Sequence, residues 1–198
     1  MIHLQQFLSV EQQLEVLQAC REVGKRSPLF VPRMKNGSNF SCQMTNCGEV
    51  GWISDEQGYR YSTIHPTTGK PFTPMPEIIK NLAKSLAAQH ANDAGFIPQT
   101  CLINYYENGS KLGLHQDNSE PNKTAPIISI SLGDDAIFLV GGNKRSDKTR
   151  EILLKSGDVI ILAGESRMIY HGIKKIIPST SSLLKAGGRL NLTIRQVY

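Results

Sequence analysis

Apolar positions repeat at helical spacing in two segments of the first hundred residues. Ser9, followed three positions later by Gln12, matches the capping box that opens many helices. Apolar residues then recur every three or four positions as far as Val23, and Gly24 is the expected stop. A second segment, from residue 76 to about 91, shows the same spacing. The pattern therefore predicts two helices before residue 100.

After residue 100 the pattern changes to short β-rich runs separated by turn residues. Strands are predicted at 101–106, 112–116, 127–132, 136–140, 151–154, 158–162, 168–173 and 190–197. Shorter strand-like pieces surround Met44 and residues 59–61, between the two predicted helices. Many short strands at this spacing are typical of a sandwich or barrel, and a double-sheet jelly roll can hold a site in its mouth. The predicted class is mainly β, although periodicity alone does not separate a jelly roll from other sandwiches.

Composition restricts the class of protein without identifying it. A chain of 198 residues with 39% apolar and 20% charged residues fits one globular domain. The net charge of +5 can attract a polyanion such as nucleic acid. On charge alone, however, a solvated basic face is the better explanation.

The cysteines and the lack of long apolar runs indicate where in the cell the protein is located. The four cysteines lack the spacing of a zinc site and are too few for a disulfide scaffold, so we expect free thiols. The N-terminus has no signal-peptide pattern, and no stretch approaches the roughly 18 apolar residues that span a bilayer. We therefore expect a cytoplasmic protein with no membrane partner.

Two histidines and one aspartate form a candidate metal site. His115 and Asp117 are two positions apart, so in a strand their side chains point to the same side. His171 lies in another predicted strand, where Gly172 would let the backbone bend beside a metal. Two imidazoles and one carboxylate can occupy one face of iron(II) and leave positions open for an oxidisable acid and dioxygen. Taken singly, His171 is better explained as a core histidine and Asp117 as a turn residue, but the combination favours a metal.

The last predicted strand carries two arginines on one face. Arg189 and Arg195 are six positions apart, with Asn191 and Thr193 between them on the same side. Such a face is costly to bury unless an anion is bound, and arginine can hold a carboxylate through two hydrogen bonds. The alternative is an amphipathic edge strand with a solvated face. Together with the metal motif, the pattern favours binding of an organic acid.

These motifs occur in an order that resembles one known family. The matching segments are NYYENGSKLGLHQD at 104–117, SISLG at 129–133, GDV at 157–159, GESRMIYHGI at 164–173 and RLNLTIRQ at 189–196. Upstream, MTNCG at 44–48, GW at 51–52 and QGY at 57–59 also match. The chain resembles the AlkB family of iron(II)- and 2-oxoglutarate-dependent nucleic-acid dealkylases, in particular its bacterial branch, from about residue 40 onward.

The resemblance implies a fold and a set of site residues. The fold would be a double-stranded β-helix (jelly roll), with N-terminal helices and a nucleotide-recognition lid at about 1–99 and a catalytic core at about 100–198, all in one domain. The metal ligands would be His115, Asp117 and His171, which hold Fe(II). The residues that hold 2-oxoglutarate would be Asn104, Tyr106, Arg189, Asn191 and Arg195. The residues that contact the substrate would be Met44, Trp52, Tyr59, Ser119, Glu120 and Arg145.

The activity implied by the resemblance is oxidative dealkylation of bases such as 1-methyladenine and 3-methylcytosine. It would consume 2-oxoglutarate and dioxygen and release an aldehyde, succinate and carbon dioxide. The partner would be alkylated single- or double-stranded DNA, or RNA. Separately from the resemblance, nothing in the sequence suggests an obligate partner, so we expect a monomer. The damaged base must be unpaired or flipped out to be reached. One departure concerns Ser119, where the bacterial branch has an acidic residue, and this puts the relative handling of adenine and cytosine lesions in question.

Two other interpretations stay open at this point. The same chemistry could serve a hydroxylase of a protein or small molecule, although the region around Trp52 and Tyr59 argues against this. A non-catalytic jelly-roll binding module is the other alternative. A complete set of metal and cosubstrate residues would be hard to explain in such a module.

Overall fold

The computed structural model describes residues 1–198, with twelve strands, two α-helices and one short 3-10 helix. In chain order the elements are β1 (Ile2–Leu4), α1 (Val10–Arg26), β2 (Gln43–Gly48), β3 (Gly51–Asp55), β4 (Gly58–Ser62), α2 (Glu77–His90), β5 (Thr100–Tyr106), β6 (Leu112–His115), β7 (Ile127–Gly133), β8 (Asp135–Val140), β9 (Arg150–Leu154), β10 (Val159–Leu162), η1 (Gly164–Ser166), β11 (His171–Ile177) and β12 (Arg189–Arg195). Neither α-helix is long and apolar enough to cross a membrane.

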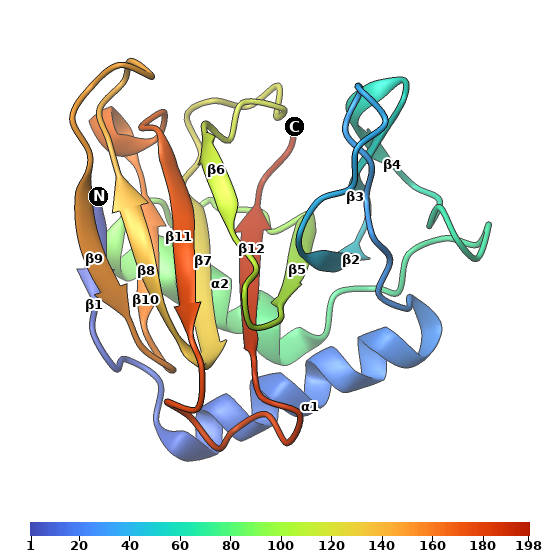
Figure 1. Ribbon diagram of the computed structural model, residues 1–198, viewed down its shortest axis with the longest axis horizontal. Helices are drawn as coiled ribbons and strands as arrows, with labels where there is room; N and C mark the ends of the chain where they lie inside the picture. Colours follow the sequence, from blue (N-terminus) through green and yellow to red (C-terminus); the bar gives the residue numbers. More distant parts are fainter.

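The strands form three antiparallel sheets, two of which make the body of the fold (Figure 1). The large sheet has the order β1-β10-β7-β12-β5-β2, and the smaller one has the order β6-β11-β8-β9. The hairpin β3–β4 forms a sheet of its own and lies beside β2. The mainly β class and the two-sheet arrangement predicted from the sequence are confirmed. The large sheet takes β1 and β2 from the N-terminal half, so both halves of the chain contribute to the body.

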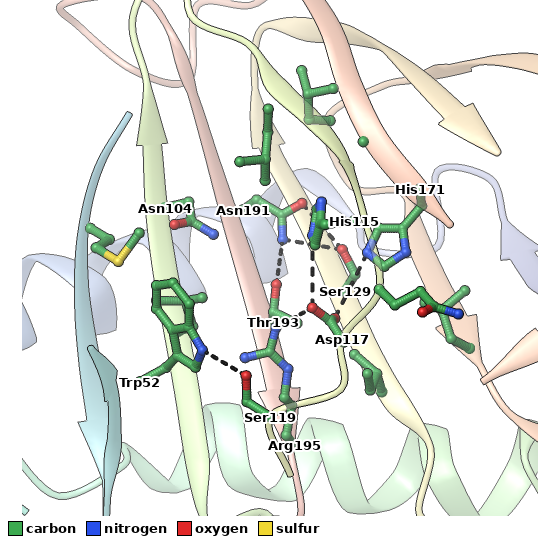
Figure 2. Close-up of a pocket in the computed structure, with 18 of the residues that line it drawn as sticks. Trp52, Asn104, His115, Asp117, Ser119, Ser129, His171, Asn191, Thr193 and Arg195 are labelled. Carbon is green, nitrogen blue, oxygen red and sulfur yellow. Dashed lines mark hydrogen bonds and ion pairs between the residues drawn. The ribbon is translucent and has the colours of Figure 1, made fainter. Parts of the chain in front are cut away.

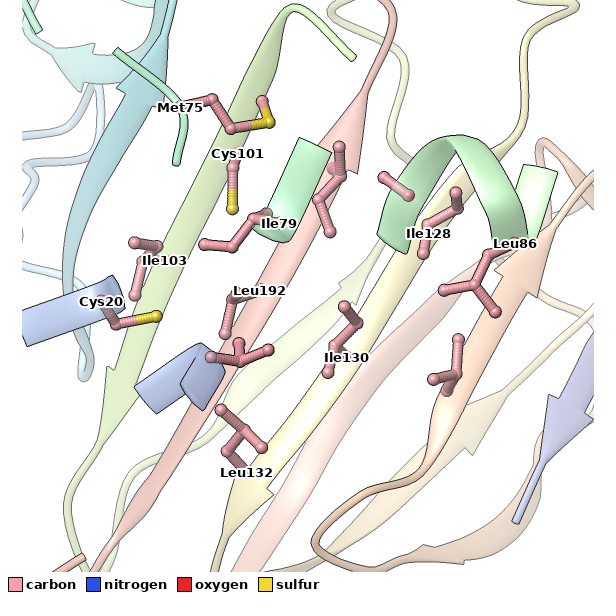
Figure 3. Close-up of a cluster of buried hydrophobic side chains, with 14 of the residues drawn as sticks. Cys20, Met75, Ile79, Leu86, Cys101, Ile103, Ile128, Ile130, Leu132 and Leu192 are labelled. Carbon is pink, nitrogen blue, oxygen red and sulfur yellow. The ribbon is translucent and has the colours of Figure 1, made fainter. Parts of the chain in front are cut away.

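The two helices cover the outer face of the large sheet and close one of the two apolar cores (Figure 3). Ile79 and Leu86 of α2 and Cys20 of α1 pack there against strand residues such as Ile130 and Leu192, all of them buried. A second core lies between the large sheet and the smaller one. The helix-covered face therefore supports the sheet, and the opposite face is free to carry a site.

Strand β12 shows how alternation divides the residues between these two environments. Leu190, Leu192 and Ile194 belong to the core beneath the helices. Arg189 and Arg195 are equally buried but, by the alternation of side chains along a strand, project with Asn191 to the other face, between the sheets. The strand is therefore apolar on one face and polar on the other, although both faces are buried.

Both predicted helices are present, and one end differs from the expectation. The Ser9 side chain accepts from the Gln12 backbone N–H at 3.2 Å, and the Gln12 side chain accepts from the Ser9 N–H at 2.9 Å, which confirms the capping box. Gly24 does not stop α1, which continues to Arg26 and ends at Ser27. Ser27 precedes Pro28, and the proline ring makes the helical conformation unfavourable for the residue before it. The second helix lies within the predicted range.

The structure differs from the strand predictions at four elements: β11, β6, β1 and β3. Residues 168–170 are not in a strand, and β11 starts at His171 and runs on to Ile177. Strand β6 ends at His115, so Asp117 lies beyond it in irregular structure. The short edge strand β1 and the strand β3 were not predicted, because neither shows a long alternating run.

Candidate active site

A pocket of about 160 Å³ opens between the large sheet, the smaller sheet and the β3–β4 hairpin. Its wall combines residues of the large sheet, the small sheet and the segment after β6 (Figure 2). All three predicted metal ligands and most of the predicted cosubstrate and substrate residues line it: Met44, Trp52, Tyr59, Asn104, Tyr106, His115, Asp117, Ser119, Glu120, His171, Asn191 and Arg195. Residues from distant parts of the sequence thus converge on one cavity.

His115, Asp117 and His171 lie together, with one donor atom from each within 4.8 Å of the others. The Nε2 atoms of His115 and His171 are 3.7 and 3.8 Å from the two carboxylate oxygens of Asp117. The Nδ1 atom of His115 lies 2.9 Å from the Gly113 carbonyl oxygen, and that of His171 lies 3.1 Å from the Ile169 carbonyl oxygen. These carbonyls favour the proton on Nδ1, so both Nε2 lone pairs are free to bind a metal. The donor set fits a divalent iron ion.

Backbone pairing explains how two of these ligands meet. His171 and His115 are register partners across β11 and β6. The strands approach closely at Gly172, where an added Cβ would lie 2.6 Å from the Leu112 carbonyl oxygen. Glycine is therefore needed here for close approach, and the pairing of β11 with β6 also shifts register between His171 and Ile173, where the sequence predicted a bend.

Asp117 reaches the site by a different route from the one predicted. Because it lies outside the strand, its position depends on contacts made by the segment after β6. The Arg167 Nη1 donates to the Asp117 carbonyl oxygen at 2.7 Å, and the Gln116 side chain donates to the Met168 carbonyl oxygen at 2.5 Å. Alternation in an extended strand does not account for this carboxylate.

The charges around the site favour the metal-binding forms of its ligands. Burial raises the pKa of Asp117, but the positive charge of Arg195, followed by the two histidines, more than offsets it and holds the pKa below its usual value. Burial lowers the pKa of His171 to about 4. A carboxylate and a neutral imidazole are the forms that ligate metals. The site is therefore poised to take up a cation near neutral pH.

The predicted 2-oxoglutarate residues occupy paired positions on β5 and β12. Arg189 is the register partner of Tyr106, and Asn191 is the partner of Asn104. The Arg189 guanidinium lies 5.5 Å from the centre of the Tyr106 ring, and its Nη2 donates to Asn191 Oδ1 at 2.7 Å. Arg189 itself lies behind the pocket wall, fully buried. Burial lowers its pKa to about 10, so it still carries a charge at neutral pH.

Several buried polar atoms along this wall have no hydrogen-bond partner. They are Nε and Nη1 of Arg189, Nε and Nη1 of Arg195, and Oδ1 of Asn104. Unsatisfied buried donors of this kind cost about 1–3 kcal/mol each, and more when they are charged. These guanidinium nitrogens suit an acid with two carboxylates, such as 2-oxoglutarate, and among them only Arg195 Nε has a carboxylate oxygen nearby, Glu120 Oε1 at 3.5 Å. The residues present therefore fit the cosubstrate.

Aromatic side chains form the mouth of the pocket. The ring of Trp52 stacks on that of Tyr59 with centroids 5.3 Å apart and an angle of 28°. Phe40 meets Trp52 edge-on at 6.2 Å. The backbone of Trp52 is fixed by the buried Asn46 of β2, whose side chain bonds both its N–H and its carbonyl. The surface formed by Phe40, Trp52 and Tyr59 suits a planar aromatic ligand.

Two of the predicted substrate residues differ in their surroundings, because Glu120 lines the pocket and Arg145 does not. Glu120 is only 1% exposed and is occupied by the Tyr61 hydroxyl and by Arg167 Nη2, the latter at 3.0 Å. Its two carboxylate oxygens each accept from one of these groups, so Glu120 helps to hold the pocket together, and a contact between Glu120 and a base stays a prediction. Arg145 is exposed and does not line the pocket, and its guanidinium lies 6.0 Å from the Tyr170 ring centre. A contact between Arg145 and phosphate stays a prediction.

The structure also adds residues that were given no role from the sequence. Ser131 accepts from Arg189 Nη2 at 2.9 Å, and Ser129 bonds Asn191 at 3.1 Å. Their alternation with isoleucine in ISIS at 128–131 signals one polar face and could have indicated them. Tyr61 and Arg167 carry no such signal, since their role depends on a fold that brings the hairpin and η1 to Glu120.

The comparisons with known proteins agree with this geometry. The model of the 2OG-Fe(II) oxygenase superfamily matches residues 1–195. The chain is 44% identical over 182 residues to the alpha-ketoglutarate-dependent dioxygenase AlkB of Escherichia coli, an alignment that covers 92% of this chain and 83% of that protein. It is 36% identical to the DNA N(6)-methyladenine demethylase ALKBH1D of Arabidopsis thaliana, over 98% of this chain and 49% of that protein. The solved structure of OsALKBH1 superposes with a TM-score of 0.82 at 33% identity, covering 98% of this chain and 97% of that one.

The fold and the site together define a dioxygenase that uses iron(II), 2-oxoglutarate and dioxygen. The chain belongs to the 2OG-Fe(II) oxygenase superfamily and, within it, to the AlkB dioxygenases. The interpretation as a non-catalytic binding module is thereby set aside.

Proposed function

We propose that this protein removes alkyl groups from the nitrogens of nucleic-acid bases of the 1-methyladenine and 3-methylcytosine type, in repair of damaged DNA or RNA. One observation carries the proposal. The same pocket brings together the metal ligand set His115, Asp117 and His171, arginine nitrogens without a hydrogen-bond partner, and the stacked rings of Trp52 and Tyr59 at its mouth. Demethylase activity on DNA is also stated in the name of the Arabidopsis relative.

The residues of the site divide the work of this reaction. His115, Asp117 and His171 would hold the iron, and Arg189, Asn191 and Arg195 would hold 2-oxoglutarate by charge-assisted hydrogen bonds. When bound, iron(II) with dioxygen and 2-oxoglutarate supplies the oxidation of the N-alkyl carbon, which leaves as an aldehyde while succinate and carbon dioxide are released. The apolar wall at Leu102, Ile127 and other residues between the sheets limits entry of water.

Access of the base depends on the aromatic mouth. A methyl group on the pairing edge is hidden in a duplex, so the base must be single-stranded or flipped out. Stacking on an aromatic such as Trp52 contributes about 1–3 kcal/mol per base. The net charge of +5 supports attraction to a polyanion and weighs against a small-molecule or protein substrate. We extend the proposal to both DNA and RNA strands, single or double.

We further infer a monomer that works in the cytoplasm. The inference on location is supported by the four cysteines, all of which are buried and free of disulfides. The inference on oligomeric state is supported by the pocket, whose ligand set and lining come from one chain.

The test is formaldehyde release from a single-stranded oligonucleotide that contains one 1-methyladenine or 3-methylcytosine, with iron(II) and 2-oxoglutarate supplied. Formaldehyde and succinate should appear in equal amounts, and the Asp117→Ala variant should release neither. Succinate formed without formaldehyde, at a rate that the methylated strand does not change, would contradict the proposal and favour a hydroxylase of another substrate.

A further inference from the structure

Asp134 bonds both ends of the segment 178–188, which joins β11 to β12 (Figure 1). It is the single residue between β7 and β8, where the chain passes from the large sheet to the smaller one, and it is 3% exposed. Its Oδ1 accepts from the backbone N–H groups of Thr180 and Ser181 at 3.0 and 3.1 Å. Its Oδ2 accepts from the N–H of Gly188 at 2.8 Å. One buried carboxylate therefore receives three backbone donors of this segment.

The segment has few other anchors. Its residues are mostly half-buried or exposed and line an open hollow of about 920 Å³. Leu183 and Leu184 pack against the core beneath the helices and hold its middle. Close to its end, the Tyr105 hydroxyl donates to the Gly187 carbonyl oxygen at 3.2 Å. Segments with few buried contacts open locally at little cost, so the conformation at both ends depends on Asp134.

Arg189 directly follows this segment and is the first residue of β12. The backbone N–H of Asp134 donates to the Gly188 carbonyl oxygen at 2.8 Å, so Asp134 bonds Gly188 on both sides of its Cα. The Arg189 side chain, in contrast, bonds only to two neutral acceptors, Ser131 Oγ and Asn191 Oδ1, both through Nη2. Its other two guanidinium nitrogens have no partner. The position of this guanidinium is therefore set largely by the backbone that Asp134 fixes.

The two arginines of β12 differ in their relation to the metal ligands. Arg195 is paired with Asp117 at 3.0 Å, whereas Arg189 lies at the opposite end of the strand. In 2-oxoglutarate the 2-oxo acid group can chelate a metal, and the second carboxylate lies at the far end of the molecule. Arg195 therefore belongs to the metal end of the cosubstrate, and Arg189 belongs to the distal carboxylate.

We propose that Asp134 is a positioning residue for the cosubstrate, which fixes the start of β12 so that the Arg189 guanidinium meets the distal carboxylate of 2-oxoglutarate. The inference rests on the cosubstrate site of the proposed function. Asp134 does not line the pocket, and it acts through Gly188 and Arg189. A small displacement of a binding group can remove much of its contribution. A carboxylate is required, because it accepts all three N–H groups and has no donor to place against them.

The first measurement is a calorimetric titration of 2-oxoglutarate into the iron-loaded protein in the absence of oxygen. Asp134→Asn should raise the Kd of 2-oxoglutarate about tenfold, because its amide turns a donor toward one of the backbone N–H groups. Asp134→Ala should raise this Kd at least as much. The control is Asp135→Asn, which makes the same change at the next residue. Asp135 contacts Thr180 through its backbone N–H and not through its carboxylate, so the control should bind 2-oxoglutarate normally.

A second ligand shows which end of the cosubstrate is affected. The probe is 2-oxobutyrate, which keeps the 2-oxo acid group and lacks the distal carboxylate. Its Kd should be the same for the wild type and for Asp134→Asn, since only the distal contact passes through Arg189. Loss of affinity for both acids by the same factor would mean that Asp134 supports the whole fold, and would overturn the inference.

A double variant tests whether Asp134 acts through Arg189. Arg189→Gln alone should weaken the binding of 2-oxoglutarate. Asp134→Asn added to Arg189→Gln should change the Kd by less than about twofold, because a misplaced side chain that is already absent cannot be lost again. Effects that multiply in the double variant would show that the two residues act independently, and would overturn the inference.

Turnover of a methylated single-stranded oligonucleotide gives the matching kinetic pattern. Asp134→Asn should raise the KM for 2-oxoglutarate about tenfold and leave both kcat and the KM for the oligonucleotide within about twofold, since the lost contact serves cosubstrate binding alone. An unchanged Kd of 2-oxoglutarate in both Asp134 variants would overturn the inference and leave the proposed function intact. An unchanged Kd in Arg189→Gln would instead overturn the cosubstrate site of the proposed function, and the inference with it.

Discussion

Arg195 donates from Nη2 to Oδ1 of Asp117 across 3.0 Å, and both side chains are nearly inaccessible to solvent. One of these residues is a predicted metal ligand, and the other is a predicted 2-oxoglutarate residue. The pair therefore links the two binding functions directly. Arg195 also lies 3.5 Å from Glu120, so its charge has two acidic neighbours, whereas Arg189 has no carboxylate partner.

The two arginines should consequently give different phenotypes when replaced. Arg189→Ala should mainly weaken the binding of 2-oxoglutarate, since it removes a charge-assisted contact worth about 1.5–3 kcal/mol. Arg195→Ala should weaken the binding of both 2-oxoglutarate and iron, because it also leaves the buried Asp117 carboxylate without its arginine partner. Titrations of each ligand, with oligonucleotide at saturation, measure both effects. Equal iron affinities in the two variants would refute the structural role given to the Arg195–Asp117 pair.

Replacement of any metal ligand should abolish turnover. His115→Ala, Asp117→Ala and His171→Ala each remove one of three protein ligands, so iron binding should weaken sharply as well. Equilibrium metal binding and formaldehyde release measure the two effects. His3→Ala is a suitable control, since His3 bonds Asp158 at the edge of the large sheet and lies outside the pocket. Dealkylation at the wild-type rate by any of the three variants would contradict the metal assignment.

The sequence was sufficient where a role depends on the residue and its local spacing. The even separation of Arg189, Asn191 and Arg195 placed them on one buried face, because alternation is a property of any strand. The capping box at Ser9 is equally local and was confirmed. Motif order was enough to bring His115 and His171 together as candidate ligands before the register was known.

The sequence was insufficient where a role depends on tertiary contacts. Asp117 lies beyond the end of β6, and its position depends on Arg167, 50 residues later. Glu120 has the chemistry of a substrate contact, and only its burial against Tyr61 and Arg167 shows that it is occupied. The hydrogen bond between Trp52 and Ser119 joins residues 67 apart, so no spacing rule could have predicted it.

Trp52 should act on the base and leave the metal site intact. Trp52→Ala should weaken binding of a methylated single strand by about 1–3 kcal/mol, because it removes the stacking surface. Uncoupled decarboxylation of 2-oxoglutarate should persist at nearly the wild-type rate. Trp52→Phe keeps a stacking ring but loses the hydrogen bond to Ser119, so it should bind the methylated oligonucleotide with intermediate affinity. If Trp52→Ala instead loses the binding of iron or 2-oxoglutarate and still binds the methylated oligonucleotide normally, Trp52 is a core residue.

Gly172 should be required for the approach of β6 to β11, and therefore for the distance between His115 and His171. An alanine Cβ at this position would lie 2.6 Å from the Leu112 carbonyl oxygen and 3.0 Å from that of Gly113, and backbone atoms cannot move aside cheaply. Gly172→Ala should therefore push the strands apart, lower the free energy of unfolding by about 1–3 kcal/mol and weaken iron binding about tenfold.

The neighbouring strand offers a matched control for this prediction. At Gly113 an added Cβ would meet no atom within 4 Å, although the residue lies only two positions from His115. Gly113→Ala should therefore keep normal iron affinity and close to normal stability, as measured by metal titration and urea unfolding. If both variants lose iron binding equally, a general loss of backbone freedom in β6 and β11 is responsible. If neither does, the close approach at Gly172 has no part in placing the two histidines.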